Sequence, residues 1–102
     1  MGIHLQATLE IEAVGFERFL ATMGEAVPIL EGVGWKLAGA YMHCTGRLHT
    51  VVDLWQLEDY NHYERGMHAL MGHARFPALR QALAETVRNE TLVFLQPLSY
   101  AR

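Results

Sequence analysis

Apolar and polar side chains alternate through residues 3–12. The odd positions from Ile3 to Ile11 are apolar, and the even positions from His4 to Glu12 are polar or charged. Because successive side chains of a strand point to opposite faces of a sheet, this pattern predicts a β-strand with one apolar face.

The period then changes from two residues to three or four. An apolar stripe predicts a helix over residues 15–31, and its members are Phe16, Phe19, Leu20, Met23, Val27 and Leu30. Pro28 has no backbone N–H to donate, so we expect it to kink the helix or end it early. Gly32 and Gly34 then favour the turn that leaves the helix.

Two further strands, over residues 35–43 and 48–57, are predicted on either side of a turn at residues 44–47. The second strand is rich in the branched and aromatic side chains that strands favour. If the turn is symmetric about Gly46, four pairs of residues lie opposite each other on one face of the hairpin. These pairs are His43 with His49, Tyr41 with Val51, Gly39 with Asp53, and Leu37 with Trp55.

The rest of the chain predicts a broken helix and a final strand. Asp59 is suited to cap a helix that reaches Gly72, Pro77 suits the first turn of a second helical segment, and residues 90–96 form a strand. The order strand, helix, strand, strand, broken helix, strand predicts a single α+β domain over residues 1–102. We expect the ferredoxin-like arrangement, an antiparallel four-stranded sheet with its helices on one face.

The two faces of this sheet are expected to differ in what covers them. To the helices we assign the apolar side of the first strand together with Leu48, Val52 and Leu54. The other face then receives His4, Gln6, Thr8, Glu10, Trp35, Leu37, Tyr41, His43, His49, Val51, Asp53, Trp55 and Leu57. This second face is too apolar for exposure to water and too polar for a dry core. We therefore expect a homodimer in which two such faces pair and enclose a semi-polar cavity.

Composition and charge exclude several functional classes. The 102 residues suffice for one domain, and the net charge of −3 gives no basic excess for binding nucleic acid. The single cysteine, Cys44, rules out an intramolecular disulfide and fits a reducing compartment. The sequence contains neither a membrane-length apolar run nor a signal-peptide pattern. We therefore expect a cytoplasmic protein that binds neither nucleic acid nor membrane.

The segment VVDLWQLEDYNHYERGMHAL resembles the most distinctive part of the NIPSNAP family. An apolar pair, Asp53 and a Leu-Trp pair precede the acidic and aromatic stretch from Asp59 to Arg65, which opens a helix. The resemblance extends from the first strand to LVFLQPL near the C-terminus. It implies a dimeric α/β barrel made of two ferredoxin-like subunits. The wider group of proteins with this barrel includes cofactor-free monooxygenases, haem-degrading enzymes, isomerases and cyclases.

Asp53 is the leading candidate for acid–base chemistry, because a carboxylate on a strand rich in tryptophan is unusual. His49 lies about 13 Å away along the same strand and cannot touch it directly. Asp53 is instead placed to orient a histidine from a neighbouring strand, His4 or His43, and so to form a general base. The alternative is that Asp53 binds a Tyr, an Arg or a backbone group at the dimer interface.

The other histidines give weaker signals. His43 and His49 could share a metal ion, but Cys44 points to the other face, and a metal site needs three or four convergent ligands. We therefore expect neither a metal nor a cofactor. Three histidines of the second helical region do not share a helical face and are expected to face solvent; these are His62, His68 and His73.

We expect a homodimer that binds a small aromatic or apolar organic molecule. The predicted substrate-binding residues are Gln6, Trp35, Leu37, Tyr41, Val51 and Trp55. Asp53 and one of the histidines His4, His43 and His49 would transfer protons. The candidate reactions are proton abstraction beside a carbonyl, as in isomerisation or cyclisation, and oxygen insertion. The alternative is a non-catalytic dimeric interaction or scaffold protein, whose polar residues satisfy one another across the dimer.

Overall fold

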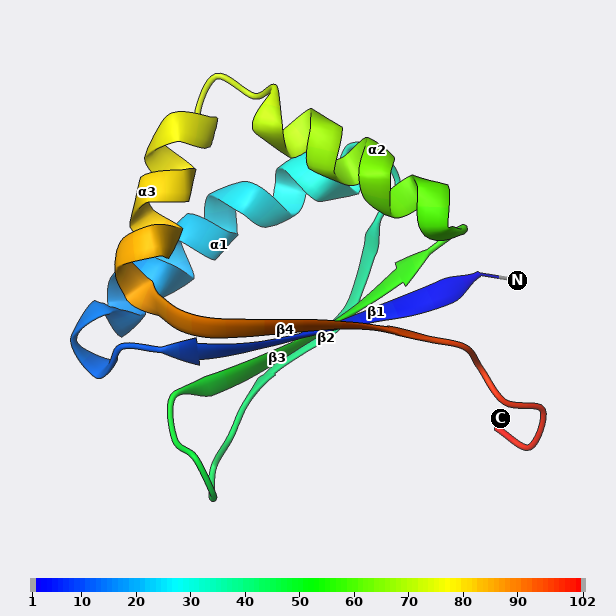
Figure 1. Cartoon of the computed structure of the whole chain (residues 1–102), viewed down its shortest axis with the longest axis horizontal. Coiled ribbons are helices and arrows are strands. Elements are labelled where there is room, and N and C mark those ends of the chain that lie inside the picture. The colour runs from blue at the N-terminus through cyan, green and yellow to red at the C-terminus, as the bar shows by residue number, and fades with distance from the viewer. Residues whose placement is uncertain (1, 102) are drawn as a thin grey trace.

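The computed structural model describes residues 2–101, and its elements follow the predicted order (Figure 1). They are β1 (Ile3–Ile11), a 3-10 turn η1 (Ala13–Gly15), α1 (Phe16–Glu31), β2 (Lys36–Met42), β3 (Thr50–Leu57), α2 (Tyr60–Met71), α3 (Phe76–Thr86) and β4 (Val87–Leu95). The strands form one antiparallel sheet in the order β2–β3–β1–β4. All three α-helices lie on one face of it, which confirms the predicted ferredoxin-like fold.

The local signals for the helices act largely as predicted. Asp59 caps α2, because its side chain accepts a hydrogen bond of 2.9 Å from the backbone N–H of His62. Pro77 lies in the first turn of α3, where its missing N–H costs nothing. Pro28 does not end α1 early, since the helix continues to Glu31. The last strand begins at Val87, directly after α3, which is three residues earlier than predicted.

The odd-numbered side chains of β1 form the centre of the core beneath the helices. In β3 the same face carries Val51, Asp53, Trp55 and Leu57, because Leu5 pairs with Trp55 and Ala7 with Asp53, and paired residues share a face. All four of these β3 residues are buried.

The predicted assignment of β3 is therefore wrong. The helices cover the face with Asp53 and Trp55, whereas Val52 and Leu54 lie on the opposite face and Leu48 precedes the strand, exposed to solvent. The physical reason is that β3 is apolar on both faces. The sequence pattern of β3 alone therefore does not indicate which face the helices cover. Its pairing register with β1 decides this.

The hairpin of β2 and β3 is not symmetric about Gly46. Tyr41 pairs with Val52 and Ala40 with Asp53, so the predicted pairs of Tyr41 with Val51 and Gly39 with Asp53 are wrong. A bulge between Leu37 and Gly39 restores the predicted pair of Leu37 with Trp55. Leu37 consequently faces the helices, while Tyr41 faces away from them.

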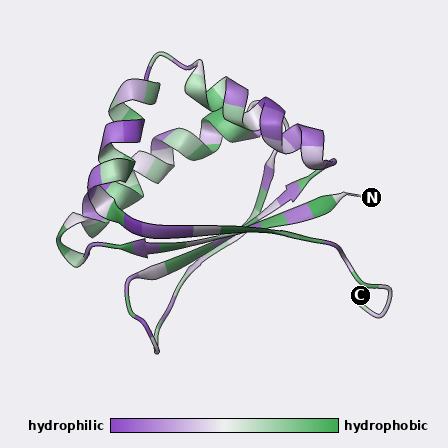
Figure 2. Cartoon of the chain, in the orientation of Figure 1, coloured by the Kyte–Doolittle hydropathy of each residue, from purple (hydrophilic) through white to green (hydrophobic). Residues whose placement is uncertain are grey.

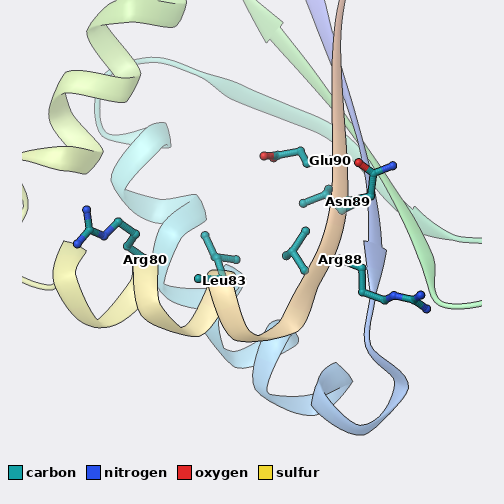
Figure 3. Close-up of a pocket in the computed structure, with 8 residues that line it drawn as sticks. Arg80, Leu83, Arg88, Asn89 and Glu90 are labelled. Atoms are coloured by element: carbon teal, nitrogen blue, oxygen red, sulfur yellow. The ribbon is translucent and has the colours of Figure 1, made fainter.

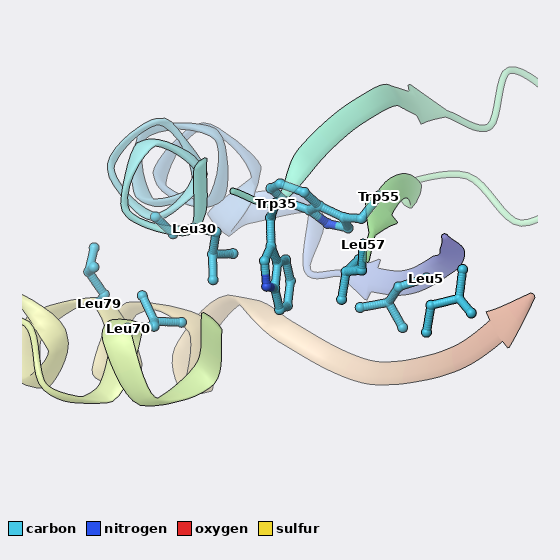
Figure 4. Close-up of a cluster of buried hydrophobic side chains, with 9 residues drawn as sticks. Leu5, Leu30, Trp35, Trp55, Leu57, Leu70 and Leu79 are labelled. Carbon is cyan, nitrogen blue, oxygen red and sulfur yellow. The ribbon is translucent and has the colours of Figure 1, made fainter. Parts of the chain in front are cut away.

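Two tryptophan side chains pack between the sheet and the helices (Figure 4). Trp35 and Trp55 are 4% and 3% exposed, and their rings meet edge to face at 5.3 Å between centroids. The indole N–H of Trp35 donates a 2.9 Å hydrogen bond to the carbonyl of His62 at the start of α2. Trp35 and Trp55 are therefore core residues on the helix side, which corrects their predicted place on the other face.

The sheet face away from the helices is uncovered in this chain (Figure 1). We call it the open face; the strand pairings place on it His4, Gln6, Thr8, Glu10, Lys36, Gly39, Tyr41, Thr50, Val52, Leu54, Gln56, Asn89, Thr91, Val93 and Leu95. Figure 2 shows hydrophilic and hydrophobic segments mixed along these strands.

Within residues 2–101, none of the helices is long and apolar enough to cross a membrane.

Candidate functional site

A cavity of about 230 Å³ lies between the sheet and the three helices. Its walls are mostly apolar and come from all three helices and from β1, β3 and β4. Aromatic rings form one side, since Trp35 contacts both Trp55 and Tyr63, the latter at 5.7 Å between centroids. A concave, mostly apolar space with few polar groups is the usual form of a site for a small organic molecule.

Asp53 supplies a buried carboxylate to this cavity. It is 5% exposed, and its neighbours across the sheet are the small residues Ala7 and Ala40, which leave space around it. None of the hydrogen bonds or ion pairs within residues 2–101 involves this carboxylate. Burial, followed by the negative charge of Glu90, raises its pKa from the ordinary 3.8 to about 6.

Glu90 is the second carboxylate of the cavity, near its mouth. Glu90 pairs with Leu9 and so lies on the helix face of β4, where its side chain extends towards the helices (Figure 3). Its charge, together with burial as the larger cause, also raises the pKa of Tyr63. Glu90 itself is exposed, which distinguishes it from the buried Asp53.

Arg80 of α3 also lines the cavity at its mouth. Its guanidinium carbon lies 6.0 Å from the centroid of the Phe76 ring, and Figure 3 shows the group pointing away from Glu90. Among residues 2–101, the ion pairs include neither Arg80 nor Glu90. The mouth therefore presents one charge of each sign.

Two more open depressions adjoin the cavity. One of about 450 Å³ shares Arg80, Leu83 and Glu90 with it (Figure 3). The other, about 360 Å³, lies between α1 and β2 and shares Met23 and Asp53. Asp53 thus lies where the cavity meets the depression beside β2.

Comparison with known proteins identifies the family of this chain. The NIPSNAP family model matches residues 6–102. The chain belongs to the NIPSNAP family. No curated protein matches its sequence.

Solved structures share the fold of this NIPSNAP chain at low sequence identity. An uncharacterised NIPSNAP domain protein from Burkholderia xenovorans is 22% identical, with a TM-score of 0.82 and 98% of each chain covered. A NIPSNAP family protein from Agrobacterium tumefaciens is 17% identical, with a TM-score of 0.86 and coverage of 99% of this chain and 97% of that chain. A putative antibiotic biosynthesis monooxygenase from Bacteroides thetaiotaomicron is 16% identical, with a TM-score of 0.74 and coverage of 95% and 90%.

The fold of this NIPSNAP protein brings together only some of the predicted site residues. Trp35, Asp53 and Trp55 line the cavity, and Leu37 and Val51 line the adjoining depression beside β2. Gln6 and Tyr41 lie on the open face instead, on the other side of the sheet. The predicted cavity on the open face is therefore replaced, within this chain, by one on the helix side.

None of the three predicted histidines lies beside Asp53. His4 is on the open face. The Nδ1 atom of His43 lies 3.2 Å from the carbonyl oxygen of Arg47 in the hairpin, and the ring of His49 packs edge-on against Phe16 at 5.8 Å. His49 has a φ of 61°, so it belongs to the turn and not to a regular strand. The expected pairing of Asp53 with a histidine is therefore wrong for this chain.

His62 was expected to face solvent but is 1% exposed. Its Nδ1 accepts from the backbone N–H of Glu58 at 2.9 Å, and its Nε2 lies 2.7 Å from the carbonyl of Val33 and donates to it. Both ring nitrogens are occupied, so this histidine fastens the start of α2 to the turn before β2. Its role is structural.

Glu90 is the cavity residue that the sequence did not reveal. It begins the apolar run ETLVFL, where it resembled an ordinary polar end of a strand. Only its register opposite Leu9 puts it on the helix face.

Within residues 2–101, no three His, Cys, Asp or Glu side chains gather closely enough to hold a metal ion.

Proposed function

We propose that this NIPSNAP protein binds a small, largely apolar organic molecule in the cavity between its sheet and its helices. The observation that carries the proposal is the buried Asp53 carboxylate, which lines an aromatic cavity without a partner within residues 2–101. The cavity volume is below the roughly 300–1,000 Å³ of sites for drug-sized ligands. The ligand is accordingly small, about the size of a single-ring aromatic compound.

Asp53 is the group that takes up and returns a proton in the catalytic form of this proposal. With a pKa of about 6 it is largely ionised at neutral pH, yet it is a stronger base than an ordinary aspartate. Isomerisation and cyclisation beside a carbonyl require only such proton transfer. Oxygen insertion, suggested by the similar fold of the Bacteroides thetaiotaomicron protein described as a putative monooxygenase, would also need dioxygen beside the substrate.

The alternative of a non-catalytic scaffold finds less support. A purely structural Asp53 would be expected to bind an Arg, a Tyr or a backbone group, because an unpaired buried carboxylate destabilises the fold. None of the ion pairs formed by residues 2–101 includes it.

We also propose that the chain forms a homodimer through the open face. The two tryptophans expected on this face do not contribute to it, since both are buried under the helices. Exposed apolar side chains remain at two places on that face: Tyr41 is 59% exposed beside Val52, and Val93 of β4 is 44% exposed and separated from Leu54 by Gln6 of β1. Apolar side chains that a second copy can cover by a two-fold axis support this assembly.

Filling the cavity tests the binding proposal. Trp35 and Trp55 are the only tryptophans in the sequence and both line the cavity, so their fluorescence reports on its occupancy. We expect compounds from a panel of single-ring aromatics to change the emission of the native protein. Ala7→Leu, which adds bulk beside Asp53, should abolish the response.

The matched control is Ala21→Leu, the same substitution at an exposed position of α1 that lines none of the three pockets. It should leave the response unchanged, with circular dichroism showing that both variants are folded. Equal binding by folded Ala7→Leu and native protein, or no binding by any compound of the panel, would refute the proposal.

A further inference from the structure

We propose that the cavity selects a small organic cation: a protonated amine attached to one ring or a short apolar chain. Its ammonium group contacts Asp53, and its apolar part lies against Trp35, Trp55 and Tyr63. This inference rests on the function proposed above and narrows the class of ligand.

The two carboxylates of the cavity give it a negative potential. Asp53 on β3 and Glu90 on β4 flank β1, opposite Ala7 and Leu9 respectively, and both face the helices. From strand spacings of about 4.8 Å and a rise of about 3.3 Å per residue, their backbones are roughly 12 Å apart. They do not form a hydrogen-bonded pair, and the Asp53 carboxylate is buried whereas that of Glu90 is exposed.

The burial of Asp53 favours a cationic ligand over a neutral or anionic one. An ionised carboxylate that is 5% exposed and unpaired within residues 2–101 is unfavourable in the empty cavity. An ammonium group of the ligand would donate a charged hydrogen bond to the Asp53 carboxylate, whereas a ligand carboxylate would add a third negative charge to the cavity. The raised pKa of Asp53 reports the same unfavourable environment.

The aromatic wall favours the same ligand. Trp35 lies at the centre of the wall, with its ring centroid 5.3 Å from that of Trp55 and 5.7 Å from that of Tyr63. These three rings provide an apolar surface for the ring or short chain of the ligand, and Asp53 lines the same cavity as the group that binds its ammonium.

The charged and titratable groups that face Asp53 come from three elements. They are Tyr63 of α2, Arg80 of α3 and Glu90 of β4. The lining residues contributed by β1 and α1 are apolar. Arg80 is the one cation among the residues that line the cavity, and its guanidinium lies beside Phe76 at the exposed end, where it does not pair with Asp53.

Three probes of similar shape test this selectivity: 2-phenylethylamine, 2-phenylethanol and 3-phenylpropionate. At pH 7.5, we expect the amine to bind at least ten times more tightly than the alcohol, and the carboxylate to bind most weakly. Lowering the pH to 5 protonates Asp53 and should weaken binding of the amine, with little effect on the alcohol.

Asp53→Asn should reduce the affinity for the amine to that for the alcohol and remove the pH dependence. Glu90→Gln should reduce the preference for the amine by a smaller factor and serves as the second variant if the first does not fold. The matched control, Glu64→Gln, removes a charge from an exposed part of α2 that lines none of the three pockets and should change nothing.

The outcomes distinguish this inference from the proposed function. If the alcohol binds as tightly as the amine, or the carboxylate binds best, the cation preference is refuted while the cavity remains a binding site. If no compound of the single-ring aromatic panel binds, these three probes included, the proposed function fails, and this inference fails with it.

Discussion

Asp53 combines two properties that oppose each other in a single residue. Its aliphatic neighbours bury it, and its charge is unfavourable there, so the folded chain favours the protonated carboxyl group. Residues that are retained at a cost to stability are typical of ligand sites. The effect of Asp53 on folding can therefore be separated from its effect on binding.

We predict that Asp53→Asn stabilises the protein at pH 8. Folding raises the pKa of Asp53 from 3.8 to about 6, so the native protein is most stable, with respect to this group, below about pH 4. It loses that stability as the pH rises through 6 and the buried carboxyl group ionises, whereas the amide of the variant does not ionise. At 1.36 kcal/mol per pKa unit, the variant gains up to about 3 kcal/mol in the free energy of unfolding at pH 8.

Urea denaturation of both proteins at pH 4 and pH 8 measures this difference. The free energy of unfolding of the variant should exceed that of the native protein by much at pH 8 and by little at pH 4. A variant that is less stable than the native protein at pH 8 would indicate that Asp53 has a partner that stabilises its charge.

At the scale of elements, α2 packs closely against the ring of Trp35. Gly66 of α2 packs against the indole of Trp35, and a Cβ at this position would lie 2.2 Å from its Nε1 atom. The ring is held by Trp55, by Tyr63 and by its hydrogen bond to His62, so it has little freedom to move. The close approach also forms one wall of the cavity.

We predict opposite effects of Gly→Ala at two helical positions. Gly66→Ala should destabilise the protein by about 2 kcal/mol or more, because α2 must move away from Trp35. Gly24→Ala in α1, where a Cβ meets nothing within 4 Å, should stabilise it by about 0.4–1 kcal/mol. Thermal unfolding of the two variants compares them, and similar effects of both substitutions would contradict the close packing.

The success of prediction from the sequence also differed by element. The strict alternation of β1 was sufficient for its bounds and its faces, because each odd position is apolar and each even one polar. β3 has Val51 beside Val52 and Leu54 beside Trp55, so both of its faces are apolar and only its partner strand decides between them. The bulge at Ala38 has no clear signal in the sequence.

The candidate site was predicted in part for the same reason. Asp53, Trp35 and Trp55 were identified by their residue types, and the structure does bring them to one cavity. Their side of the sheet was wrong, and with it the choice of the histidines and the omission of Glu90. The residue types thus indicated the chemistry of the site, whereas the strand register determined which side chains line the same cavity.

At the scale of the whole molecule, the two faces of the sheet have separate roles in our proposals. In these proposals the cavity on the helix side binds the ligand, and the open face would pair with a second copy. A substitution on the open face should therefore change assembly without changing the ligand site.

We predict that Val93→Arg converts the dimer to a monomer, because two copies of the new charge would be buried beside apolar side chains. Sedimentation velocity at micromolar concentration measures the change, with Val14→Arg, at an exposed residue of the turn η1, as the control. A native protein that sediments as a monomer would refute the proposed dimer and leave the cavity proposal in place.

The most direct test of the site is the pKa of Asp53 itself. Its carboxyl carbon can be followed through a pH titration by ¹³C NMR, and Asp53→Asn identifies the signal. We predict a value of about 6 in the free protein, a lower value in Glu90→Gln, and a further decrease when an amine is bound. A value near 3.8 in the free protein would show that Asp53 is solvated or paired, and would contradict an unpartnered carboxylate in the cavity.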